Sequence, residues 1–251
     1  MKRAIYLSVI SAVTAVCMVV GICYHMLGRG GNFPGISFFY GKWGETVSLE
    51  NEELASFEEI SVVSDIMNVT LKQGSGYSIS YKSSKKILPE YKVENGVLSL
   101  TQKQQKRSWN NFTCNVTITV PKTASLGAIT INSNCGDTKM DGIMTASIHA
   151  DADVGDIKIS NCSVGDVVLQ TDVGDCKFED CSFDNMDIVS DIGDIKVEST
   201  KDLSAYNMDI YTDLGDVKIN GQKQRKAYST EGSSGNLLKI VTDCGDIHVS
   251  D

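Results

Sequence analysis

The chain contains few of the residues from which catalytic and metal sites are usually built. It has three histidines in 251 residues, and two of them, His149 and His248, fall at outward positions of strand-like segments. It has no Cys-x-x-Cys pair and no Cys/His cluster, which argues against a zinc site. No phosphate-binding loop, nucleophile motif or isolated carboxylate pair stands out. We therefore predict that the protein is not an enzyme and uses no cofactor.

Proline and positive charge are also scarce. Three prolines beside 22 glycines suit a chain with many tight turns. The formal net charge is −9, and Lys2 and Arg3 are the only formal charges among the first 27 residues, so the remaining chain carries −11. An acidic body repels phosphate groups, which argues against nucleic acid as a partner.

No helical stripe follows residue 27, but residues 4–27 form one long apolar run without a formal charge. A helix of about 20 such residues spans a bilayer, and the basic start places the N-terminus in the cytoplasm. A cleaved signal peptide is the alternative, but its apolar region is usually about 7–15 residues and ends at a small-residue site, which Tyr24-His25-Met26-Leu27 lacks. We predict a cytoplasmic tail (1–3), an uncleaved single-pass transmembrane anchor (4–27), a juxtamembrane linker (28–44) and an extracytoplasmic C-terminal domain at the cell membrane.

The dipeptide Gly-Asp recurs through the second half of the chain, each time between apolar residues. The main copies are Gly136-Asp137, Gly155-Asp156, Gly174-Asp175, Gly193-Asp194, Gly215-Asp216 and Gly245-Asp246, with one more at Gly165-Asp166. The main copies are separated by 19 residues three times, then by 22 and by 30. A period near 20 with strand-like sequence between the marks is typical of stacked coils.

Strands with period-2 alternation flank every Gly-Asp pair, so one face of each strand points inward. Val173 and Cys176 should both face inward although they are three residues apart, so a corner lies between them. We expect Gly to supply a positive φ there and Asp to hydrogen-bond the local backbone. Cys135 and Cys244 hold the position of Val173 in other repeats, and we expect them to face inward as small apolar residues. The structural turns are predicted at Gly136, Gly155, Gly174, Gly193, Gly215 and Gly245.

The predicted fold is all-β: a β-solenoid of about 19–22-residue coils in residues 138–251. Residues 45–137 also alternate like half-buried strands, with a hairpin signal at Asn95-Gly96. We expect them to form an N-terminal β-strand cap, because the exposed end of a solenoid must be covered. The polar segment 221–236 is expected to be a protruding loop or a strand excursion.

This order of features resembles a known family. The residues that carry the likeness are the strand pattern of 57–71, Val116-Thr117-Ile118-Thr119-Val120-Pro121-Lys122, and Ile129 to Asp137 with the repeats that follow. The chain resembles the "putative adhesin" family of β-strand-repeat domains of unknown function, which includes LiaG-like envelope proteins of Gram-positive bacteria. The resemblance covers residues 45–251 and implies a β-helix-like fold at the bacterial cell envelope, with no catalytic residues to carry over. Members of that family usually have Ser before Gly-Asp, whereas this chain has Cys, Val, Ile or Leu.

The repeats place carboxylates in two rows, one two residues before each Gly and one directly after it. Rows spaced about 4.8 Å per coil suggest Ca²⁺ in the turns, as in other β-rolls. The Ca²⁺ candidates are Asp153, Asp156, Asp172, Asp175, Asp191 and Asp194. A structural reading is favoured, because a parallel row of lysines can neutralise the carboxylates without metal and the Gly-Gly-x-Gly-x-Asp turn is missing. That row consists of Lys139, Lys158, Lys177, Lys196 and Lys218.

Cys162 and Cys181 lie 19 residues apart, at the same turn position of adjacent coils. Their Cα atoms would be about 4.8 Å apart, within the range that a disulfide accepts. An extracytoplasmic location permits oxidation. The sequence leaves two readings open, a disulfide and a pair of free stacked thiols, of which the second is favoured.

Together these features indicate a non-enzymatic, membrane-anchored protein that displays a β-repeat domain outside the cell membrane, as an adhesin or as an envelope-maintenance module. Its expected partners are the cell membrane through the N-terminal helix, and a cell-wall polymer or another envelope protein. The first alternative is an envelope-stress sensor that acts with a membrane partner. The second is a glycan-active enzyme, because parallel β-helices can carry Asp pairs on one face.

Overall fold

The computed structural model describes residues 45–102 and 112–251. The predicted tail (1–3), anchor (4–27) and linker (28–44) lie outside the described residues. Within those residues, no helix is long and apolar enough to cross a membrane. Regular structure there consists of strands and one 3₁₀ turn, η1 (Lys85–Ile87), so the predicted all-β class is confirmed.

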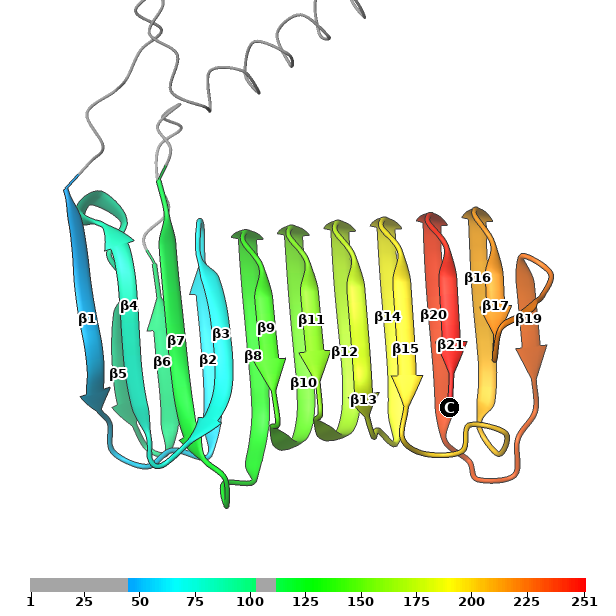
Figure 1. Ribbon diagram of the computed structural model, residues 1–251, viewed down its shortest axis with the longest axis horizontal. Helices are drawn as coiled ribbons and strands as arrows, with labels where there is room; N and C mark the ends of the chain where they lie inside the picture. The colour runs from blue at the N-terminus through cyan, green and yellow to red at the C-terminus, as the bar shows by residue number, and fades with distance from the viewer. Residues whose placement is uncertain (1–44, 103–111) are drawn as a thin grey trace, which may run out of the picture. The chain divides into compact units, whose positions relative to one another are not determined.

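The strands form two sheets (Figure 1). The eleven-stranded sheet has the order β1 (Thr46–Glu53), β4 (Ser78–Ser84), β7 (Cys114–Pro121), β3 (Asn68–Gly74), β9 (Thr138–Asp141), β11 (Ile157–Ser160), β13 (Cys176–Cys181), β15 (Ile195–Ser199), β21 (Ile247–Ser250), β17 (Val217–Ile219) and β18 (Gln222–Lys223). The ten-stranded sheet has the order β19 (Ala227–Thr230), β16 (Asn207–Leu214), β20 (Leu237–Cys244), β14 (Asn185–Ile192), β12 (Ser163–Val173), β10 (Met144–Val154), β8 (Leu126–Cys135), β2 (Glu59–Ser64), β6 (Val97–Thr101) and β5 (Glu90–Glu94).

Each coil of the stack is one strand of the ten-stranded sheet, a Gly-Asp corner and one strand of the other sheet. Neighbouring coils pair in parallel and in register, so that Ile157 lies beside Cys176 and Lys158 beside Lys177. Equivalent residues therefore form straight rows through the stack. The inward rows meet between the sheets in one apolar core, where Leu169 and Ile188 are fully buried. The solenoid prediction is confirmed.

The order of the coils in space differs from their order in the chain at both ends. The C-terminal coil, β20–β21, lies between β14–β15 and β16–β17, which precede it in sequence. At the other end, β2–β3 lies between β6–β7 and β8–β9. We had expected the repeats to stack in chain order, and local sequence periodicity does not specify which coil comes next.

Antiparallel strands complete both ends of the stack. β4 and β1 extend one sheet and β5 the other at the N-terminal end, whereas β18 and β19 do so at the opposite end. The strand excursion predicted within 221–236 is therefore present. The boundary predicted at residue 137 does not separate a cap from the stack, because β2, β3, β8 and β9 already belong to parallel coils.

The corners are glycine because the backbones of adjacent coils lie in close contact there. A Cβ atom added to Gly174 would meet the carbonyl oxygen of Gly155 well inside the 3.0 Å that real Cβ atoms keep, and Gly193 relates to Gly174 in the same way. The predicted positive φ occurs at Gly136, Gly155, Gly174 and Gly193. Gly215 and Gly245 lack that φ but show the same overlap, so close approach is the constraint that they share.

Substituting Ala for Gly174 should destabilise the fold by about 3 kcal/mol, because the added methyl collides with rigid backbone at a left-handed position. Gly76→Ala is the control: its Cβ would have no neighbour within 4 Å, and we expect a change within about 0.5 kcal/mol. Urea denaturation of both variants measures this. Equal stability of the two variants would contradict the close-approach explanation.

Candidate functional site

Each Asp that follows a corner Gly accepts a hydrogen bond from the next coil. The Asp156 Oδ1 atom accepts from the Asp175 backbone N–H at 3.0 Å, and Asp175 Oδ1 accepts from Asp194 at 3.0 Å. Asn68 begins this series with its amide oxygen, which accepts from the Asp137 N–H at 2.9 Å. The bonds thus link coils, whereas we had expected them to close each turn locally. This ladder Asp row, in stacking order, is Asp137, Asp156, Asp175, Asp194, Asp246 and Asp216.

Hydrogen bonds to the carboxylate stabilise the ionised form of part of this row. The Lys177 ammonium and the Asp194 N–H lower the pKa of Asp175, and the Lys223 ammonium lowers the pKa of Asp216. Because the pKa of Asp175 is lower in the folded state, its contribution to stability is complete above its unfolded value, about 3.9, and is lost as pH falls through the folded pKa.

The residue before each corner Gly faces solvent, which corrects the prediction that Cys135 and Cys244 face inward. Both cysteines are exposed, and Val173 and Leu214 in the same position are 43% and 63% exposed. Six apolar side chains therefore form an exposed line along successive coils, which we call the corner ridge. In stacking order it consists of Cys135, Val154, Val173, Ile192, Cys244 and Leu214.

The inside of the corner is occupied by small side chains three residues before each Gly, which leaves the ridge residues outside. Thr212 donates a hydrogen bond from Oγ1 to the carbonyl oxygen of Gly245 at 2.9 Å, and Thr242 donates to Gly193 at 3.5 Å. Thr171 and Ser190 fill equivalent buried positions. The chain therefore leaves the inward alternation one residue earlier than the sequence pattern predicts.

A second row of carboxylates lies beside the corner ridge, on the ten-stranded sheet. This outer Asp row consists of Asp153, Asp172, Asp191, Asp243 and Asp213, all exposed. No hydrogen bond or ion pair reaches these five carboxylates from the rest of the described chain. The predicted lysine row does not balance them: Lys177 pairs with Asp175 at 2.8 Å, whereas Lys158 and Lys196 pair with glutamates. The ridge, the outer Asp row and the ladder Asp row together form the corner surface.

The Ca²⁺ candidates belong to these two rows. Asp153, Asp172 and Asp191 lie in the outer row, and Asp156, Asp175 and Asp194 lie in the ladder row. The corner ridge separates the rows. Across residues 45–102 and 112–251, no three His, Cys, Asp or Glu side chains are grouped so as to hold a metal ion.

Cys162 and Cys181 are stacked free thiols in the buried core. Their mutual hydrogen bond and burial raise the pKa of Cys162, so this thiol stays protonated at neutral pH. Burial likewise raises the pKa of Cys176 to about 12. These cysteines are packing residues here, and they contrast with the exposed thiols of Cys135 and Cys244.

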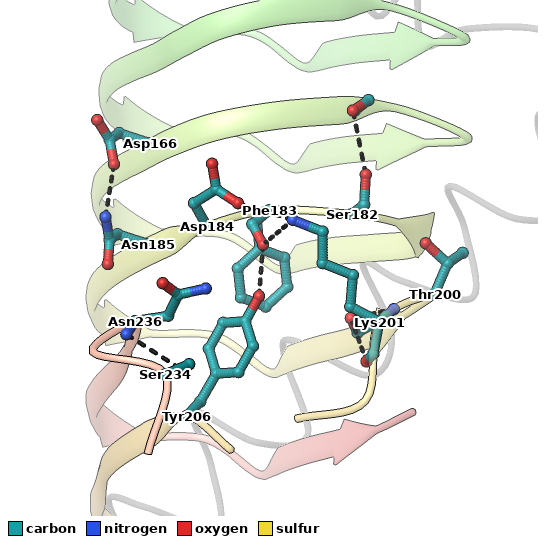
Figure 2. Close-up of polar contacts among 12 residues, drawn as sticks. Asp166, Ser182, Phe183, Asp184, Asn185, Thr200, Lys201, Tyr206, Ser234 and Asn236 are labelled. Atoms are coloured by element: carbon teal, nitrogen blue, oxygen red, sulfur yellow. Dashed lines mark hydrogen bonds and ion pairs between the residues drawn. The ribbon is translucent and has the colours of Figure 1, made fainter. Parts of the chain in front are cut away.

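A polar cluster that the sequence reasoning missed holds the connection between β15 and β16 (Figure 2). Lys201 donates from Nζ to the Phe183 carbonyl oxygen at 3.0 Å and to Asp184 Oδ1 at 2.7 Å. Tyr206 donates its hydroxyl to the same carbonyl at 2.6 Å, and its ring packs edge-on against Phe183. The connection bypasses the position of β20–β21. The 22-residue spacing before Gly215 was the only sequence signal for it.

The two facing sheets, the parallel two-strand coils and the stacked Gly-Asp corners define a β-solenoid of the repeat-domain type. A family model described as Toastrack DUF4097 matches residues 57–250. The chain belongs to this family, and the predicted kinship with adhesin-type domains of unknown function is confirmed.

Solved structures share the fold at low sequence identity. A putative cell adhesion protein from Clostridium sporogenes is 16% identical with a TM-score of 0.51, and the match covers 82% of this chain and 98% of that one. A putative adhesin from Bacteroides fragilis is 15% identical with a TM-score of 0.46, over 82% and 96%. No curated protein matches the chain.

Replacing Asp175 separates its hydrogen bond from its charge. Asp175→Ala removes the acceptor for the Asp194 N–H and should destabilise the fold by about 1 kcal/mol. Asp175→Asn keeps an oxygen acceptor, as Asn68 does in the first coil, and should cost about 0.5 kcal/mol or less. Chemical denaturation at pH 7 measures both. If the two variants lose the same stability, the ion pair with Lys177 matters more than the ladder bond.

Proposed function

We propose that this protein is a non-enzymatic, membrane-anchored interaction module of the cell envelope, which binds its partner through the corner surface. The observation that carries the proposal is the corner ridge, a continuous line of exposed apolar side chains along six coils. Continuous exposed apolar surface is uncommon on a monomeric protein unless it meets a partner.

The fold itself does not require apolar side chains at these positions. Val154, Val173 and Ile192 are about half exposed, so they contribute little to the core. The inside of the corner is filled by other residues, and the Gly contacts set the turn. A polar side chain would serve the turn equally well, which supports an interaction role for the ridge.

The proposed location rests on the sequence. The apolar run 4–27 after Lys2 and Arg3 suits an anchor with a cytoplasmic N-terminus, which places the β-solenoid outside the cell membrane. Binding to a cell-wall polymer would make the protein an adhesin, and binding to a membrane protein would make it a regulator or sensor.

A membrane-impermeant maleimide tests this location. In intact spheroplasts it should label Cys135 and Cys244, which are exposed, as mapped by mass spectrometry. The buried thiols of Cys114, Cys162, Cys176 and Cys181 should react only after denaturation and serve as the internal control. Labelling of Cys135 and Cys244 that appears only after lysis would refute an extracytoplasmic domain.

Photo-crosslinking in the living cell tests the binding surface. A photoreactive residue in place of Val173 should yield a crosslinked envelope component, because its side chain lies in the middle of the ridge. The control carries the same residue at Ser163, which is exposed at the other end of strand β12. Crosslinks from both positions, or from neither, would contradict the assignment of the corner surface.

A further inference from the structure

We propose that the partner at the corner surface presents a cationic amphipathic helix, with an apolar stripe flanked by Lys or Arg. This inference rests on the proposed function and names the chemistry of the partner. The ridge would contact the apolar stripe, and the two Asp rows would contact the basic residues on either side of it.

Charge favours a cationic occupant. The five carboxylates of the outer Asp row are exposed and have no partner in the described chain, and they lie side by side in consecutive coils. Like charges about 4.8 Å apart repel each other. Cations from a partner would relieve this repulsion. The ladder Asp row gives the opposite flank of the ridge the same sign, although its Oδ1 atoms already accept backbone hydrogen bonds.

Spacing favours a helix over an extended strand. Six ridge residues span five coil intervals, about 24 Å, which equals the length of about 16 helical residues. A helix presents side chains to one face at intervals of about 4.5 to 6 Å, which bracket the coil spacing of about 4.8 Å. An extended strand repeats on one face about every 6.6 Å and loses register after two coils.

A second copy of this chain is a poorer occupant. Two ridges in contact would bring the carboxylate rows of both copies together, and the lysines nearest to them already pair within their own chain. Val173 and its neighbours offer a line only one residue wide. The small apolar area cannot offset repulsion along both flanks.

The test measures binding of a fluorescent 16-residue peptide with a Leu stripe flanked by Lys. The full chain is held in nanodiscs of zwitterionic lipid, with empty nanodiscs as the blank. Fluorescence anisotropy should show binding that weakens with added NaCl. A peptide of the same composition with Leu distributed around the helix, and a striped peptide with Glu in place of Lys, should bind at least tenfold more weakly.

Two triple variants separate the contributions of the ridge and of the outer Asp row. Val154→Ser, Val173→Ser and Ile192→Ser alter the ridge, whereas Asp153→Asn, Asp172→Asn and Asp191→Asn neutralise the row. Each triple variant should weaken binding at least tenfold. The matched control is Glu50→Gln, Glu53→Gln and Glu58→Gln, which removes three exposed charges far from the corner surface and should change binding less than threefold.

A second measurement needs no substitution. Saturating peptide should slow the alkylation of Cys135 and Cys244 at least fivefold and leave the buried thiols unaffected.

Unchanged binding by the ridge variant, or an equal loss in the glutamate control, would reduce the effect to general electrostatics and overturn the inference. A dimer that dissociates on ridge substitution would overturn it in favour of self-association. If Val173 captures a partner in cells while the peptide fails to bind, the proposed function stands and this inference falls.

Discussion

Close contact between glycine backbones at the corners sets the geometry of the whole stack. With no Cβ to separate them, adjacent coils keep the spacing of hydrogen-bonded strands through the turn as well as along the sheets. Each residue then lies beside its equivalent in the next coil. The Asp ladder, the buried hydroxyl row and the corner ridge all follow from that alignment, since each is one repeat position extended along the stack.

Much of the fold could be predicted from the sequence, because the Gly-Asp period and the alternating strands are local signals. The order of the coils could not. Met186, Leu238 and Met208 hold the same inward position in β14, β20 and β16, so apolar pattern alone does not decide which strands are neighbours. Insertion of β20–β21 depends on the longer connection before β16 and on its anchoring by Lys201 and Tyr206.

The candidate site was predicted less well than the fold. The two carboxylate rows look alike in sequence, yet one is bonded to backbone and the other has no partner among the described residues. Strict alternation placed Cys135 and Cys244 in the core, whereas the turn begins at those residues and exposes them. Alternation describes a strand but not its last residue, where the path of the backbone decides which way a side chain points.

The exchanged order at the C-terminal end bears on how the domain withstands force and exopeptidases. In a stack that follows chain order, the last strand is paired on one edge and can be peeled away one bond at a time. Here β21 is hydrogen-bonded to β15 on one edge and to β17 on the other. Tension or digestion that starts at Asp251 must break two ladders together, so the chain end is among the more firmly held parts of the domain.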